Sequence, residues 1–285
     1  MRISFKRGLC SLAAVVAIGL GFAVWAVCIE PAQLKFREYP VYVKGWPEQL
    51  QGFSIAFITD THVGSPHITL NKLQTIVSQT NARHPDLILL GGDYVIQGVL
   101  GGHPVSSTAI VDMLSKLHAP AGVYGVLGNH DWWDNAPRIH QEFDNRRVQI
   151  LEDTSHHIQV DGKGFWITGV SDYNEGAHDI PKALATVSGT DPVILLTHSP
   201  DIFPGVPPRV ALTIAGHTHG GQVYIPFIGR PVVPSKYGQR YAKGLVEENG
   251  RQLFVGSGIG TSILPVRFLT PPEVSILKLY PSRNP

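Results

Sequence analysis

The sequence predicts an α/β fold in which helices cover a largely parallel sheet, and a second, more antiparallel sheet packs on the first. Short, continuous apolar runs recur along the chain, as expected for strands buried on both faces. Helical patterns separate the earlier runs, at residues 70–83, 106–118 and 136–147. Strand–helix alternation of this kind is typical of a sheet with helical cover.

The first element along the chain is an uncharged apolar run, residues 8–29, which follows Arg2, Lys6 and Arg7. As a helix this run would measure about 30 Å, the hydrocarbon thickness of a bilayer. We therefore expect residues 1–30 to form an uncleaved, single-pass transmembrane anchor in the inner (cytoplasmic) membrane. A cleaved signal peptide, ending near residues 24–26, is the alternative. The basic residues before the run favour a cytoplasmic N-terminus and an extracytoplasmic body.

The rest of the chain divides into a tether and one domain. Residues 31–50 are expected to be a tether that leads into a short edge strand, "VYV". No linker-like stretch follows, so residues 51–285 are predicted to form one catalytic domain. Its last third contains "GQVYIP", "KGLVEENGRQLFVGSG" and "PEVSILKLY", which we assign to the second sheet, with "ENG" as a hairpin turn.

Composition excludes two classes of function. The formal net charge is +1, so bulk electrostatics do not indicate nucleic-acid binding. The two cysteines, Cys10 and Cys28, both lie in the N-terminal run. Disulfides and thiolate metal sites are therefore excluded from the body of the chain.

Polar residues beside glycine end five of the apolar runs. Ligands in α/β sheets gather beyond the carboxyl ends of the strands, where all five clusters are expected to lie. The residues are Asp60, His62, Asp93, Asn129, His130, Asp131, His198, His217 and His219. In Asp60-x-His62 and His217-x-His219, an extended i, i+2 pair would point both side chains to one side of the strand end.

These side chains offer oxygen and imidazole donors without sulfur, a set that suits Mn²⁺, Fe, Zn²⁺ or Mg²⁺. They are too many for one tetrahedral ion. They suffice for two ions if one carboxylate bridges them. Ions roughly 3.5–4 Å apart clamp the attacking and leaving oxygens of a phosphoryl displacement and activate a bound water.

The five blocks together resemble the calcineurin-like metallophosphoesterase superfamily. They are Asp60-x-His62, Gly92-Asp93, Gly128-Asn129-His130-Asp131, His198 and Gly216-His217-x-His219, in the family's order across residues 53–222. The longer forms "LLGGDY", "GNHDWW" and "GHTHGGQVYIP" are most similar to the bacterial membrane-associated phosphodiesterase subgroup, which includes enzymes similar to UDP-2,3-diacylglucosamine pyrophosphatase.

The resemblance implies a four-layer α/β/β/α sandwich and a role for each residue. Asp60, His62 and His219 would hold the first metal, Asn129, His198 and His217 would hold the second, and Asp93 would bridge them. His130 would be catalytic, donating a proton to the leaving oxygen or stabilising its charge. Asp131 would orient His130.

We therefore expect a dinuclear, metal-dependent phosphodiesterase in which a metal-bridging hydroxide attacks phosphorus in line. Mn²⁺ is the first candidate, with Fe, Zn²⁺ or Mg²⁺ as alternatives. A hydrolase of UDP-2,3-diacylglucosamine type, with a lipid-linked pyrophosphate substrate, is the second reading, and a catalytically inactive membrane-attached binding module is the third. Of Trp132 and Trp133, one is expected in the core, and the other could offer an apolar ledge to a lipid. Asp172 is expected in a surface loop.

Overall fold

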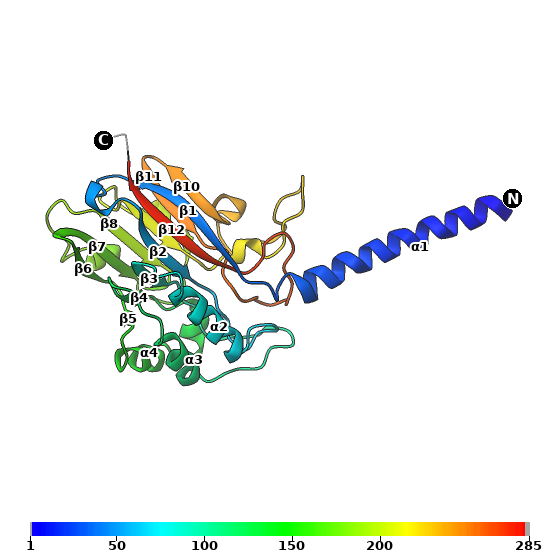
Figure 1. Cartoon of the computed structure of the whole chain (residues 1–285), viewed down its shortest axis with the longest axis horizontal. Coiled ribbons are helices and arrows are strands. Elements are labelled where there is room, and N and C mark those ends of the chain that lie inside the picture. The colour runs from blue at the N-terminus through cyan, green and yellow to red at the C-terminus, as the bar shows by residue number, and fades with distance from the viewer. Residues whose placement is uncertain (1, 283–285) are drawn as a thin grey trace.

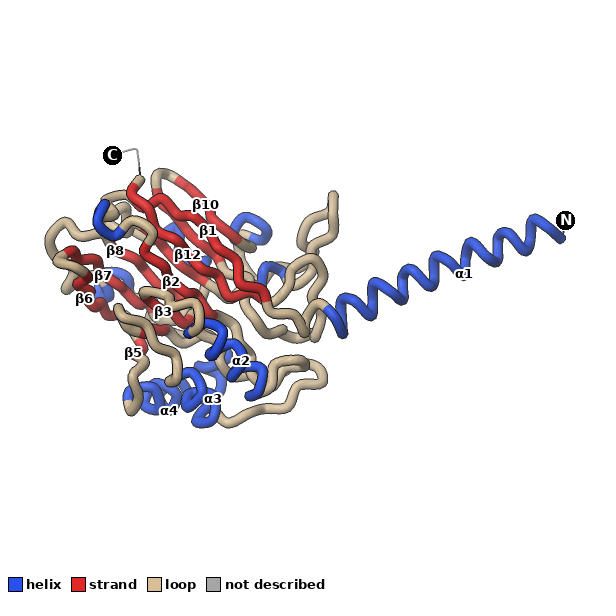
Figure 2. The backbone as a smooth tube through the Cα atoms, in the orientation of Figure 1, coloured by secondary structure: helices blue, strands red, loops and turns tan. Residues whose placement is uncertain are grey.

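Two six-stranded mixed sheets form the body of the protein (Figure 1, Figure 2). The computed structural model describes the backbone of residues 2–282 and the side chains of residues 13–282. In the first sheet, every pairing but β12–β2 is parallel. Its strands, in spatial order, are β1 (Lys35–Val43), β12 (Glu273–Pro281), β2 (Phe53–Ile58), β3 (Leu87–Leu90), β4 (Val123–Gly125) and β5 (Gln149–Ile150).

The second sheet is parallel inside and antiparallel at both edge pairs. Its spatial order is β10 (Gly244–Glu248), β11 (Arg251–Val255), β9 (Leu212–Ala215), β8 (Val193–Thr197), β7 (Lys163–Val170) and β6 (Thr154–Val160). The turn between β10 and β11 is the predicted "ENG" hairpin. The expected α/β fold with two sheets is therefore confirmed, and both sheets are mixed.

Helices cover the outer faces of both sheets. The first sheet carries α2 (Leu70–Asn81), α3 (Ser107–Leu114) and α4 (Asn129–Asp144), near the three ranges expected from the sequence (Figure 1). The second sheet carries only short turns of helix: α5 (Ile180–Ala183), η3 (Pro200–Gly205) and η5 (Gly238–Tyr241). Two further turns of 3₁₀ helix are η2 (Glu48–Leu50) and η4 (His219–Gly221).

Three apolar cores separate these layers, and the alternation of side chains along each strand creates them. In β2, Ala56 and Ile58 face α2–α4, whereas Ile55 and Phe57 face the second sheet. On the other sheet, Val193 of β8 packs outward against α5 and η3. Burying one such aliphatic or aromatic side chain stabilises the fold by about 1.5–3 kcal/mol. Strands buried on both faces therefore fix the two sheets against each other.

The C-terminal third differs from the sequence prediction. β12 lies in the first sheet, between β1 and β2, and not in the second sheet. The stretch "GQVYIP" forms isolated bridges, Val223 with Phe268 and Ile225 with Gly229, and no strand. The apolar pattern specifies a buried strand but not which sheet edge it joins, because both sheets bury one face in the same core.

Residues 31–50 contain the predicted edge strand, which is longer than the expected "VYV". β1 spans Lys35–Val43 and pairs along its whole length with β12. Val41 and Val43 are fully buried, while Tyr42 between them is exposed. This segment is therefore an integral edge strand of the first sheet.

The N-terminus forms α1 (Arg2–Val24) and a turn of π-helix, η1 (Trp25–Ile29), which project from the body (Figure 1). The predicted membrane-spanning run, residues 8–29, falls partly on residues 8–12, whose side chains lie outside the described part of the chain. Within the described part, no helix has both the length and the apolar character needed to cross a membrane. The structure therefore gives the predicted anchor no support.

Candidate metal centre

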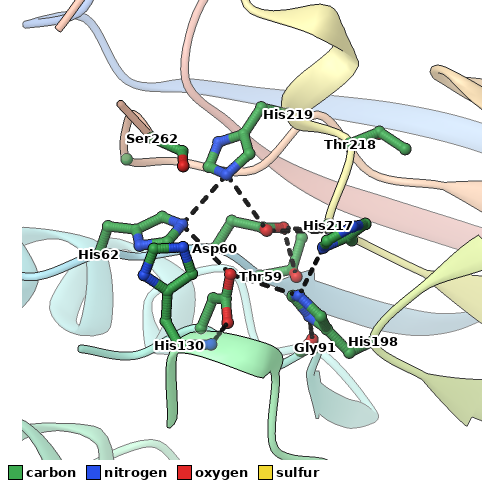
Figure 3. A network of polar contacts seen from close by, with 12 residues as sticks. Thr59, Asp60, His62, Gly91, His130, His198, His217, Thr218, His219 and Ser262 are labelled. Atoms are coloured by element: carbon green, nitrogen blue, oxygen red, sulfur yellow. Dashed lines mark hydrogen bonds and ion pairs between the residues drawn. The ribbon is translucent and has the colours of Figure 1, made fainter. Parts of the chain in front are cut away.

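The candidate ligands gather where strands of both sheets end. Asp60 and His62 follow β2, and Asp93 follows β3. Asn129 opens α4. His198 follows β8, and His217 and His219 follow β9. Because parallel strands end at the same edge of a sheet, loops far apart in sequence converge there (Figure 3).

Four of these residues form one group: Asp60, His62, Asp93 and His219, which are all buried. The Nε2 atoms of His62 and His219 lie 3.1 Å apart. His62 Nε2 is 3.4 Å from Asp93 Oδ2, and His219 Nε2 is 3.5 Å from Asp60 Oδ1. The donor atoms of the group thus face a common point.

A second group joins Asp93 to His198 and His217. His198 Nε2 lies 3.3 Å from the same oxygen, Asp93 Oδ2, and 3.1 Å from His217 Nδ1. Asp93 Oδ1 accepts the backbone N–H of His130 at 2.9 Å. Oδ2 is therefore the oxygen that both groups share.

Backbone carbonyls fix which ring nitrogens are free. His62 Nδ1 lies 3.2 Å from Val95 O, and His198 Nδ1 lies 2.7 Å from Gly91 O. A carbonyl only accepts, so in the neutral form of each ring Nδ1 carries the proton and Nε2 presents a lone pair. Such a partner orients the histidine ligands of most protein metal sites. Lone pairs and carboxylate oxygens that converge in a buried space fit a cation.

Asn129 provides independent evidence that the site fits a cation. Its Oδ1 is buried and has no hydrogen-bond partner among the described residues. A buried polar atom without a partner costs about 1–3 kcal/mol. A cation would satisfy this oxygen, as expected for the second group.

The local backbone differs from the extended pairs expected from the sequence. Five candidate ligands have left-handed φ angles: Asp60 (50°), His62 (40°), Asp93 (54°), His217 (68°) and His219 (52°). Such angles cost non-glycine residues about 1–3 kcal/mol each and concentrate at functional sites. Sharp turns, and not a strand geometry, therefore turn these side chains inward.

Glycine allows two of these turns to approach the ligands. A Cβ on Gly128 would lie 2.3 Å from Asp93 Oδ1. A Cβ on Gly216 would lie 2.0 Å from Thr59 Oγ1, which itself donates to Asp60 Oδ2 at 2.7 Å. Any larger residue at either position would displace a candidate ligand.

His130 lies against the first group. Its ring stands edge-on to that of His62, with centroids 4.6 Å apart, and it also contacts Trp133 at 4.7 Å. Its Nδ1 accepts the backbone N–H of Gln97 at 3.1 Å. The proton of a neutral ring is therefore at Nε2.

Asp131 has a different role from the one expected. Its carboxylate accepts the backbone N–H groups of Asp93, Tyr94 and Gly128, at 2.8–2.9 Å. It thus ties the loop after β3 to the first turn of α4 and positions Asp93 and Asn129. The ring nitrogen Nδ1 of His130 is held by Gln97 instead. The family resemblance implied that Asp131 orients His130, but the carboxylate of Asp131 is taken up by the three backbone N–H groups instead.

Burial sets the protonation of the histidines. It lowers the pKa of His62 to about 3 and that of His217 to about 4, and it also lowers the pKa of His130. These three rings are neutral at neutral pH, and for His62 and His217 this is the state that a metal ligand requires. At His198, burial disfavours the charged form, but the facing Asp93 carboxylate outweighs burial and raises the pKa well above its usual value. A proton there occupies the position that a cation would take.

Asp172 and the two tryptophans complete the surroundings. Asp172, expected in a surface loop, is buried after the end of β7, and its Oδ2 has no partner among the described residues. The same strand-end position that marked the other clusters could have identified it. Trp132 packs on the core between α2–α4 and the first sheet, as expected for one of the two tryptophans. Trp133 is 54% exposed.

The comparisons with known proteins agree with this geometry. The family model for calcineurin-like phosphoesterases matches residues 53–221. The metallophosphoesterase YkuE of Bacillus subtilis is 29% identical, across 98% of this chain and 97% of its own. The phosphodiesterase YaeI of Escherichia coli is 28% identical, across 97% and 99%. The UDP-2,3-diacylglucosamine pyrophosphatase LpxG of Chlamydia muridarum is 25% identical, across 94% and 96%.

Proposed function

The chain belongs to the calcineurin-like phosphoesterase family, and on that premise we propose that it hydrolyses phosphodiesters at a centre of two divalent cations. Membership and the metallophosphoesterase relatives make it a hydrolase of phosphoester bonds. The number of ions and the diester substrate are the proposal. The observation that carries it is Asp93 Oδ2, which His62 and His198 approach from two separate ligand groups.

The two groups assign the ions to particular residues. Asp60, His62 and His219 would hold one ion, and Asn129, His198 and His217 would hold the other, with Asp93 shared. When bound, such ions supply an activated water and neutralise the charge that develops on the phosphoryl oxygens. Mn²⁺ is the first ion to test, because the oxygen and imidazole donors suit it, as they also suit Fe, Zn²⁺ and Mg²⁺.

The chain's own residues supply the remaining chemistry. His130 lies beside the first group with its N–H at Nε2, where it can donate a hydrogen bond that stabilises the negative charge on a leaving oxygen. Asp131 holds the loops that carry Asp93 and Asn129, so both donors keep their positions while substrate binds. The buried walls exclude water from the polar atoms, which strengthens each electrostatic contact.

The preference for diesters rests on the relative named as a phosphodiesterase, YaeI, which aligns along nearly the whole chain. A second candidate is a lipid-precursor pyrophosphatase, and LpxG favours it by the substrate in its name. Comparison of soluble nucleotide diesters with UDP-2,3-diacylglucosamine, under identical metal conditions, separates the two.

The proposal is tested with purified protein and bis-p-nitrophenyl phosphate. We expect hydrolysis in the presence of Mn²⁺, loss of activity with EDTA, and recovery when Mn²⁺ is restored. A non-catalytic binding module would show no hydrolysis with any of the four metals. Metal analysis in the same preparation distinguishes an inactive protein that binds metal from one that binds none.

Location is a separate proposal. We propose attachment to the cytoplasmic membrane, with the body outside the cytoplasm, on the strength of the uncharged run at residues 8–29 and the basic residues before it. Recovery of the chain in the membrane fraction, together with a C-terminal reporter that is active only outside the cytoplasm, tests both parts.

A further inference from the structure

An apolar cavity of about 430 Å³ lies beside the metal centre. Three segments line it: the turn after β9 (218–223), the loop at 231–234, and the loop at 262–266. His219, a candidate ligand of the first ion, belongs to its wall, and Figure 3 places Ser262 next to that ring. The cavity therefore lies next to the first group of candidate ligands.

Hydrogen bonds hold the walls of the cavity in place. The Gln222 side chain accepts the backbone N–H of Ser262 at 2.6 Å and donates to Leu264 O at 3.1 Å. The backbone of Val223 bridges to Phe268 on the far side of the same loop. The buried Arg267 guanidinium donates to Gly260 O and Thr270 O, at 2.6 and 2.9 Å. The space is thus built into the loops and does not require their rearrangement.

Several apolar side chains at the cavity are exposed to solvent, so they contribute little to the stability of the fold. Val232 is 73% exposed, Ile263 is 70% exposed and Leu264 is 51% exposed, and all three line the cavity. Phe227 and Ile228, in the turn before the 231–234 loop, are also exposed. Clustered exposed apolar side chains mark binding surfaces.

The two flanks of the centre differ in chemistry. On the His130 side, Trp133 contacts the ring and donates its indole N–H to Glu175 at 2.8 Å. On the His219 side lies the apolar cavity. His62 lies between these two histidines: it stands edge-on to His130, with ring centroids 4.6 Å apart, and stacks on His219 at 4.9 Å. A substrate at the centre thus meets a polar aromatic surface on one side and a hydrocarbon-like surface on the other.

We propose that the cavity binds the hydrocarbon chain of an amphiphilic phosphoester whose phosphoryl group occupies the metal centre. This inference rests on the proposed phosphoester hydrolysis and names the class of substrate: one carrying an alkyl or acyl chain close to the scissile phosphate. The size of the cavity lies within the ~300–1,000 Å³ typical of small-molecule sites, which are mostly apolar with a few polar groups at one end.

The test is a chain-length series of p-nitrophenyl alkyl phosphodiesters, from methyl through butyl to octyl, with Mn²⁺ present and each ester below its micelle-forming concentration. We expect kcat/KM to rise with chain length, by up to about fourfold for each methylene buried. A flat series in an enzyme that hydrolyses the methyl ester would overturn the cavity proposal. No metal-dependent hydrolysis of any ester would overturn the proposed function instead.

Variants on two walls localise the effect. Val232→Glu and Leu264→Glu place a carboxylate in the cavity from exposed positions, and we expect the octyl-to-methyl ratio of kcat/KM to fall at least tenfold in each. The matched control is Leu245→Glu, an exposed leucine on β10 outside the cavity, which keeps the wild-type ratio. If both cavity variants keep the wild-type octyl-to-methyl ratio of kcat/KM, the alkyl chain of the substrate does not bind in this cavity.

A second set of assays with lipid vesicles shows whether the alkyl chain of the substrate binds in the cavity or whether a bilayer is needed. The octyl ester is offered free in solution and in phosphatidylcholine vesicles. Chain-length preference with free esters supports the cavity. A preference seen only with vesicles would mean that the exposed apolar side chains contact a bilayer, and it would overturn the proposal.

Discussion

The Nε2 atoms of His62 and His219 lie 3.1 Å apart, although the two residues are separated by most of the domain in sequence. His62 donates through Nδ1 to Val95 O, so its Nε2 presents a lone pair to the other ring. Two ring nitrogens come this close only when a proton or a cation lies between them. Asp60 Oδ1 and Asp93 Oδ2 face the same point, which favours the cation.

The two histidines of Gly216-His217-x-His219 belong to different groups of ligands. We therefore predict that His219→Ala and His217→Ala each lose one metal ion and retain the other. Metal content measured by mass spectrometry after dialysis against Mn²⁺ checks this. Loss of both ions in each variant, or of neither, contradicts the division between the groups.

His130 is predicted to act in the reaction and not in metal binding. His130→Ala should lower kcat by about 10²–10³-fold, the usual cost of removing one hydrogen-bond donor that stabilises developing charge, while metal content stays unchanged. His140→Ala is the matched control, because His140 lies on the same helix α4 and pairs with Asp144 away from the centre. Equal kcat in the His130 and His140 variants would remove His130 from the mechanism.

Asp131 is predicted to be a structural anchor of the centre. Asp131→Ala leaves three backbone N–H groups without their charged acceptor, and each such bond contributes about 1.5–3 kcal/mol. We expect the free energy of unfolding in urea to fall by about 3 kcal/mol or more. Asp134→Ala, a surface partner of Arg138 on the same helix, should cost less than about 1 kcal/mol. Similar losses in both variants would contradict the anchor role.

Glu152 is predicted to make stability depend on pH. Burial raises its pKa from 4.5 to about 8. Between these values the unfolded chain ionises while the folded chain keeps its proton, so stability from this residue falls as pH rises. Glu152→Gln removes that loss and keeps an oxygen for the backbone N–H of Leu127. We expect its advantage over the wild type to grow by about 1–3 kcal/mol between pH 5 and pH 8. Parallel pH profiles of unfolding free energy would refute this.

Much of the centre could be predicted from sequence, because each ligand follows an apolar run and parallel strands bring such ends together. Asp60, Asp93, His198 and His217 were identified in this way, and the structure places them side by side. The left-handed turns that aim them could not be predicted, since non-glycine residues rarely adopt positive φ and no propensity signals it. The contacts of Asp131 with Asp93 and Tyr94 could not be predicted for a related reason: these residues lie 38 and 37 positions away in the sequence.

In the fold, too, local features could be predicted from the sequence, whereas features that depend on distant residues could not. The buried strands and the helices α2 and α3 follow from periodicity, which depends on neighbouring residues alone. The place of β12 between β1 and β2 depends on pairing with strands more than 200 residues earlier in the chain, and a local pattern contains no such information. The apolar cavity joins three separate loops, so no single stretch of sequence indicated it.

The central claim is that Asp93 is shared by two cations. Electron paramagnetic resonance of the Mn²⁺-loaded wild type tests it most directly, with Asp93→Ala as the comparison. We predict the spectrum of a spin-coupled Mn²⁺ pair in the wild type and its loss in the variant. A wild-type spectrum of isolated Mn²⁺ ions at full metal loading would contradict the shared carboxylate.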